Sequence, residues 1–60
     1  MNKSRTASIL VVEDDPNQFR LYTKVLKAYR LTCVVNGTAA LKSIEERLPD
    51  LIILDHVLAA

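Results

Sequence analysis

Three short apolar runs alternate with two amphipathic segments along the chain, and this pattern predicts five secondary-structure elements. The runs at residues 9–12, 31–35 and 51–54 are almost entirely apolar and rich in β-branched side chains. Such runs are typical of strands that are buried on both faces of a parallel sheet. In the two intervening segments the apolar positions recur at three- and four-residue steps, which predicts a helix in each.

The first helix is expected to begin at Pro16, because proline suits the first helical position. Asp15 is expected to cap it by accepting a hydrogen bond from a free backbone N–H group. The residues of its apolar stripe are Phe19, Tyr22, Val25, Leu26 and Tyr29. This spacing predicts that the aromatic side chains face the core of the protein.

The second helix is expected over residues 39–48, after a turn at Asn36-Gly37 and with Thr38 as its cap. Pro49 ends it, since proline cannot continue a helix. The residues of its predicted inner face are Ala40, Leu41, Ile44 and Leu48.

The alternation of strand, helix, strand, helix and strand predicts an α/β fold with right-handed crossovers between parallel strands. We expect a flavodoxin-like, doubly wound half fold with the strands in the order 2-1-3. All 60 residues are assigned to one domain, with residues 1–7 as a flexible lead.

Composition narrows the classes of partner. Half of the residues are hydrophobic, which argues against disorder, and the net charge of +1 favours neither nucleic acid nor a membrane surface. No apolar stretch reaches the roughly 18 residues that span a bilayer. Cys33 is the only cysteine and is expected to be a buried strand thiol, so we expect a cytoplasmic protein without an internal disulfide.

Acidic residues follow two of the predicted strands. Glu13 and Asp14 come directly after the first, and Asp55 comes directly after the third. In the order 2-1-3 these strands are neighbours, so the three carboxylates are expected to converge at the switch point of the sheet. Two carboxylates about 4 Å apart repel by about 4 kcal/mol at an effective dielectric constant of about 20. A divalent cation reverses that repulsion, which predicts a Mg²⁺ site.

Each residue of this site has an expected role. Asp14 and Asp55 are candidate direct ligands, Glu13 acts through a water molecule, and the backbone carbonyl of Val57 supplies another oxygen. Asp55 is also a candidate nucleophile toward phosphorus. The competing interpretation is a charged loop at a helix N-terminus, where acidic residues are common. His56 is expected to be an exposed loop residue.

Three segments of the sequence, taken together, resemble a known protein family. They are Ile-Leu-Val-Val-Glu-Asp-Asp-Pro, Asn-Gly-Thr-Ala-Ala-Leu and Leu-Pro-Asp-Leu-Ile-Ile-Leu-Asp, and together they resemble the receiver domain of two-component response regulators over residues 8–58. The resemblance implies that Asp55 is the phospho-acceptor and that Glu13 and Asp14 are the acidic pair. It further implies Mg²⁺-dependent phosphotransfer in a phosphorelay, from a histidine kinase or a phosphotransfer protein, and a conformational switch.

The chain also departs from the family. It ends five residues after Asp55, and the phosphate-binding Lys and the switch Ser or Thr of the family have no counterpart. Ala59 stands where the family usually has proline. Because strand 51–54 would be an apolar edge, we expect self-association through it. An alternative function is therefore a truncated receiver remnant that acts as an interaction or dimerisation module without phosphotransfer.

A third function class is a small Mg²⁺-dependent phosphohydrolase, since α/β enzymes also use nucleophilic aspartates at strand ends. It is the weakest of the three, because such sites usually place a second aspartate two residues after the nucleophile. Val57 occupies that position here. We therefore expect a phospho-acceptor domain and not an enzyme.

Overall fold

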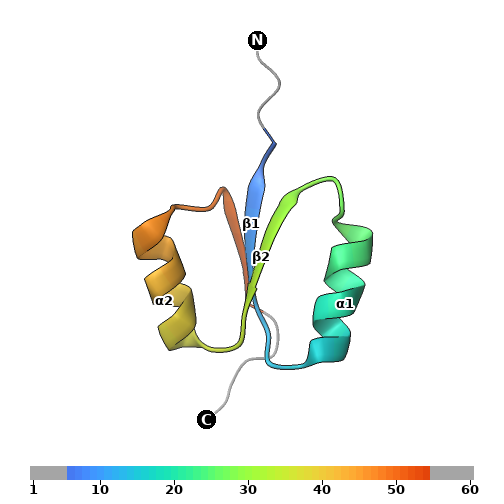
Figure 1. Ribbon diagram of the computed structural model, residues 1–60, viewed down its shortest axis with the longest axis horizontal. Helices are drawn as coiled ribbons and strands as arrows, with labels where there is room; N and C mark the ends of the chain where they lie inside the picture. Colours follow the sequence, from blue (N-terminus) through green and yellow to red (C-terminus); the bar gives the residue numbers. More distant parts are fainter. Residues whose placement is uncertain (1–5, 55–60) are drawn as a thin grey trace.

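The computed structural model describes residues 6–54 and contains all five predicted elements (Figure 1). In chain order they are β1 (Ser8–Val12), α1 (Pro16–Val25), β2 (Arg30–Val34), α2 (Gly37–Glu46) and β3 (Leu51–Leu54). The bounds of β3 agree with the prediction, β1 begins one residue earlier than predicted, and β2 both begins and ends one residue earlier. Residues 1–5 of the predicted lead lie outside the described residues.

The three strands form one parallel sheet in the order β2-β1-β3, which confirms the predicted half flavodoxin-like fold. The central strand β1 pairs with β2 from Ser8 to Val12 and with β3 from Ile9 to Val12. Figure 1 shows α1 and α2 on opposite sides of the sheet, as doubly wound crossovers require. The carboxyl ends of all three strands therefore lie at one edge.

The core of the protein is the central strand. Residues 9–12 are at most 5 % exposed, because β1 has a strand on each side and a helix over each face. Leu10 and Val12 pack against Ala40 of α2, and the half-buried Val34 and Ile44 border this cluster. Within residues 6–54, neither helix is long and apolar enough to cross a membrane.

Helix α1 begins as predicted and ends earlier than its apolar stripe suggested. Asp15 caps it, with Oδ1 accepting from the backbone N–H of Asn17 at 2.9 Å. Phe19, Tyr22 and Leu26 are half-buried, whereas Val25 is 69 % and Tyr29 is 46 % exposed. The inward placement predicted for Val25 and Tyr29 is therefore wrong. Because the helix ends at Val25 and a turn follows, the helical spacing does not extend to residue 29.

Helix α2 begins two residues earlier than predicted, and its cap is different. The side chain of Asn36 accepts from the backbone N–H of Ala39 at 2.8 Å, so Asn36 is the N-cap and Thr38 lies inside the helix. The expectation that Thr38 caps the helix was wrong, because the amide of Asn36 already accepts the N–H that a cap must satisfy.

The predicted inner face of α2 is only partly correct. Ala40 is buried and Ile44 is half-buried, but Leu41 is 65 % and Leu48 is 76 % exposed. Leu41 is one helical step away from the narrow face that contacts β1, and Leu48 follows the end of the helix at Glu46. Because α2 is the one described helix on this face of the sheet, no second helix packs against either leucine within residues 6–54.

Candidate acidic site at the carboxyl edge of the sheet

The backbone pairing of the central strand continues one residue beyond β1. The N–H of Glu13 donates to the carbonyl oxygen of Val34 at 2.9 Å. Because β1 is held on both sides up to Val12, this extra bond fixes the backbone at the point where the chain leaves the sheet. The backbone of the first acidic residue is thus held by the sheet.

Glu13 has a side chain that is 2 % exposed, the only buried charged residue within residues 6–54. Its Oε2 accepts a hydrogen bond from the backbone N–H of Asp15 at 3.0 Å. A carboxylate at this depth is costly unless hydrogen bonds or a cation stabilise its charge. Glu13 therefore places a buried carboxylate at the carboxyl edge of the sheet.

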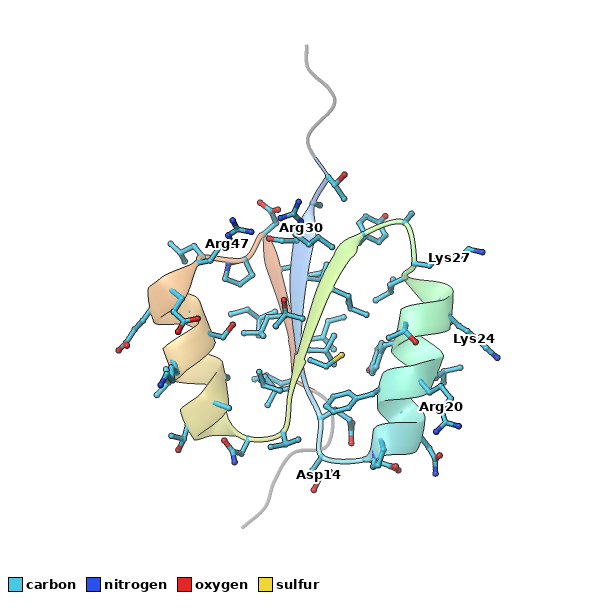
Figure 2. The ribbon with its side chains drawn as sticks, viewed as in Figure 1. Asp14, Arg20, Lys24, Lys27, Arg30 and Arg47 are labelled. Atoms are coloured by element: carbon cyan, nitrogen blue, oxygen red, sulfur yellow. The ribbon has the colours of Figure 1, made fainter. Side chains whose placement is uncertain are left out.

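The two aspartates that follow have different surroundings. Asp14 is exposed, and Figure 2 shows its side chain at the turn between β1 and α1, directed away from the sheet. Asp15 is also exposed, but its carboxylate is engaged in capping α1. Of these two aspartates, only Asp14 presents a carboxylate to an incoming ligand.

The third strand ends beside the first. Leu54 is the register partner of Val12, so the residues that follow each of them leave the sheet at the same edge. The structure brings Glu13 and Asp14 to this edge, next to the end of β3. The predicted acceptor Asp55 and the predicted carbonyl ligand Val57 lie outside the described residues, as does His56.

Two oxygen ligands of the predicted metal set lie within the described part of the chain, on Glu13 and Asp14. No group of three or more metal-ligating side chains is present among residues 6–54. Mg²⁺ typically takes one or two protein carboxylates and completes its coordination with water and phosphate oxygens. The acidic pair fits that requirement in residue type.

At the amino-terminal end of the sheet, Ser8 of β1 and Asp50 before β3 are joined by hydrogen bonds that the sequence pattern did not predict. Oδ2 of Asp50 accepts from the N–H of Ser8 at 2.7 Å and from its hydroxyl at 3.3 Å. In return, the N–H of Asp50 donates to the carbonyl oxygen of Ser8 at 2.8 Å. The sequence does show an aspartate, Asp50, directly before the strand at residues 51–54. Such a residue can bond backbone groups of a neighbouring strand, so its position was the one signal for this contact.

A shallow hollow of about 50 Å³ lies at this amino-terminal end. It is lined by residues of β1, β2 and α2 and by two residues of the segment between α2 and β3. Its polar lining residues are Ser8, Arg30, Thr32, Ser43 and Arg47. Figure 2 shows Arg30 and Arg47 near this end of the sheet and Asp14 near the opposite end, while Asp50 adds a carboxylate at the arginine end.

Fold and site together define an α/β protein whose parallel sheet carries an acidic carboxyl edge at the switch point. Searches against protein-family models, curated proteins and solved structures find no match to this chain. A function is therefore assigned from the chemistry of the acidic edge.

Proposed function

We propose that the chain is a receiver-like phospho-acceptor in phosphorelay signal transduction. In this proposal Asp55 takes a phosphoryl group from a histidine kinase or a phosphotransfer protein. Mg²⁺ is held by Glu13, Asp14, Asp55 and the backbone carbonyl of Val57. The observation that supports it is the buried carboxylate of Glu13 at the end of the central strand, beside the end of β3. A cytoplasmic location belongs to the same proposal.

The transfer is a simple exchange of bonds at phosphorus. An oxygen of the Asp55 carboxylate attacks the phosphorus of the phosphohistidine, the P–O bond forms and the P–N bond breaks. The leaving imidazole retains the electron pair of the broken bond and takes up a proton. Bound Mg²⁺ would neutralise the negative charge of the phosphoryl oxygens, so that they approach the acidic edge without repulsion.

The described residues hold the acidic edge in place for this step. The hydrogen bond from the N–H of Asp15 to Glu13 joins the end of β1 to the cap of α1. The turn that carries Asp14 is thus held at both ends, by the sheet and by the helix. A fixed turn lowers the ordering cost of ligand binding.

Phosphorylation of the full chain is the direct test. We expect incubation with Mg²⁺ and phosphoramidate to add the mass of one phosphoryl group, and we expect Asp55→Asn to abolish the addition. Asp50→Asn is the matched control, because Asp50 lies at the opposite end of the sheet and should leave labelling unchanged. Labelling that persists in Asp55→Asn would overturn the assignment of the acceptor. Release of phosphate over many turnovers would instead favour the phosphohydrolase.

Metal binding can be tested separately from labelling. We expect Asp14→Asn to weaken Mg²⁺ binding at least about tenfold by calorimetry, since loss of one carboxylate from a two-carboxylate site removes much of its charge. Asp15→Asn is the matched control, because asparagine is also a good N-cap and Asp15 is engaged with α1. Equal loss in both variants would contradict a specific role for Asp14.

The alternative function is an interaction or dimerisation module without phosphotransfer. One observation favours it, namely the exposure of apolar side chains along β3, where Leu54 is 71 % exposed. Such an edge promotes self-association. A chain that assembles through β3 but is not labelled under any condition would support this function over the first.

A further inference from the structure

The segment that contains α1 carries an unbalanced positive charge. Residues 16–30 include four of the eight basic residues of the chain and none of its seven acidic residues. This segment therefore has a charge of +4, and the rest of the chain has a charge of −3. The net charge of +1 does not reveal this concentration, because it averages over the whole molecule.

Three of these basic residues lie on the side of α1 that faces away from the sheet. Figure 2 shows Arg20, Lys24 and Lys27 pointing outward from the helix and from the turn after it. Arg20 and Lys24 are one helical turn apart, a spacing at which like charges repel. Within residues 6–54 none of the three forms an ion pair. Outside that range the sequence has a single acidic residue, Asp55, which is too little to balance this face.

Two apolar side chains are exposed on the same helix, beside the basic residues. Leu21 is 52 % and Val25 is 69 % exposed, and their spacing of four residues places them on one face of α1. Leu21 also lines a hollow of about 150 Å³ together with Asn17, Arg20 and Lys24. The hollow therefore combines two cationic groups and an amide with the side of an apolar residue.

We infer that the outward face of α1 binds the surface of an anionic lipid bilayer. In this arrangement a lipid phosphate occupies the hollow, where Arg20 and Lys24 donate hydrogen bonds to its oxygens. Leu21 and Val25 enter the boundary between headgroups and acyl chains, and Lys27 adds a third cation to the contact. The chain then lies on the membrane as a peripheral protein. The inference is independent of phosphotransfer at the acidic edge.

The shape and composition of this face favour a bilayer over other polyanions. A nucleic acid would pair with the cations, but its phosphates offer the exposed Leu21 and Val25 no apolar surface to pack against. An acidic protein would need a groove shaped to a convex face about 15 Å long, the length of a helix of ten residues. A bilayer needs no complementary shape, and its interface accepts cations and apolar side chains together.

Sedimentation of the full chain with lipid vesicles tests the contact. We expect binding to vesicles of mixed phosphatidylcholine and phosphatidylserine to be at least about tenfold tighter than binding to phosphatidylcholine alone, and to weaken as salt is added. The double variant Arg20→Gln, Lys24→Gln should raise the dissociation constant at least about tenfold, since each cation near an anionic surface contributes about fivefold. The matched control is Lys42→Gln, Arg47→Gln, which removes the same charge from α2 and the residue after it and should have a much smaller effect.

The apolar part of the contact is tested at constant charge. The double variant Leu21→Ser, Val25→Ser should weaken vesicle binding at least about fivefold, because these side chains no longer enter the interface. Leu41→Ser, Leu48→Ser is the matched control, since both leucines are exposed on the α2 side of the molecule, at 65 % and 76 %. Circular dichroism of all variants checks that the fold is retained.

Several results would overturn the inference. Equal binding to neutral and anionic vesicles, or no binding to either, would remove the role of lipid charge. Equal losses in the α1 variants and their α2 controls would show that net charge or general hydrophobicity is responsible. A duplex oligonucleotide or polyglutamate that binds more tightly than the anionic vesicles, with no loss in Leu21→Ser, Val25→Ser, would rule out the bilayer, and only the duplex would be drawn by the cations of α1.

Discussion

The strands β1 and β3 have similar sequences and very different surroundings. Both are short apolar runs followed by acidic residues, and they pair residue by residue. Leu10 is 1 % exposed and its register partner Ile52 is 44 % exposed, although both lie in the same row of the sheet. The difference arises from position, since among residues 6–54 β1 has a strand on each side and β3 has a strand on one side only. An apolar sequence therefore predicts a strand whose side chains are stabilised by burial. It does not show which part of the protein buries them.

This contrast has an energetic consequence. Burying a large aliphatic side chain contributes about 1.5–3 kcal/mol, so most of the hydrophobic stabilisation of the lone chain comes from β1 and its contacts. A chain of 60 residues buries only about 60 % of its unfolded surface and is marginally stable. Burial of the exposed side chains of β3 against another surface would add hydrophobic stabilisation, as the burial of β1 already does.

The largest expected effect compares truncation at paired positions of the two strands. Leu10→Ala should destabilise the fold by about 2–5 kcal/mol, because it leaves a cavity against Val12 and Ala40. Ile52→Ala should cost about 1 kcal/mol or less in the monomer, since much of this side chain is already in water. Urea unfolding followed by circular dichroism, at concentrations where the chain is monomeric, measures both.

The same two variants can also contradict the inferred difference in burial between β1 and β3. Equal destabilisation by Leu10→Ala and Ile52→Ala in the monomer would mean that β3 is as well covered as β1. Self-association through β3, the alternative function, predicts a different result at high concentration, in which the cost of Ile52→Ala increases because the side chain then lies at the new strand pair. A concentration-independent cost would argue against pairing through β3.

The next effect concerns the contact that attaches β3 to β1. Asp50→Ala removes the acceptor for the N–H and hydroxyl of Ser8, and we expect a loss of about 1–2 kcal/mol. Hydrogen exchange should show faster exchange in β3 than in β2, since Asp50 bonds β1 directly before β3 begins. Asp50→Asn is the matched control, because the amide keeps one acceptor oxygen. Uniform acceleration in both edge strands would contradict a local role.

Much of the fold was predictable from the sequence because strand periodicity and turn residues are local signals. The bounds of β3, the strand order and the cap at Asp15 all agree with the prediction. The start of α2 was not predicted correctly, because Asn36 and Thr38 are both good caps. Only the bond from Ala39 to Asn36 decides between them. The exposure of Leu41 was also missed, because it depends on which surfaces surround the helix.

The candidate site was predictable to a similar extent. Its position follows from the strand order, and the structure places Glu13 and Asp14 at the expected edge. The near-complete burial of Glu13 and its bond to the N–H of Asp15 were not foreseen, since three consecutive acidic residues look alike in a sequence. They differ because the strand leaves the sheet at residue 13 and the helix begins at residue 16.

A smaller effect is expected at the caps of the two helices. Asn36→Ala should destabilise the fold by about 1 kcal/mol, because the N–H of Ala39 loses its acceptor. Thr38→Ala should have almost no effect, since Thr38 lies inside the helix. Urea midpoints measure both, and the ranking would be reversed if Thr38 were the cap. Since α2 covers β1, the loss in Asn36→Ala should accelerate hydrogen exchange in β1 more than in β3.

The smallest expected effect lies on β2, the other edge of the sheet. Cys33 is half-buried there, and burial raises the pKa of its thiol above the ordinary value of 9.0, because the thiolate is poorly solvated. The neutral thiol is thus favoured in the folded state. Its contribution to stability is fully present below pH 9.0 and is lost as the pH rises through the folded pKa, since the unfolded thiol ionises first.

Comparison with Cys33→Ser isolates this contribution from the other groups that titrate at alkaline pH. The urea midpoint of the unmodified chain should fall more steeply than that of Cys33→Ser between pH 8 and pH 10, and thiol reagents should react more slowly with the folded chain than with the unfolded chain. A thiol as reactive in the folded as in the unfolded state would show that β2 is as open as β3. The contrast would then separate the central strand from both edges, and the exposure of β3 would no longer distinguish it from β2.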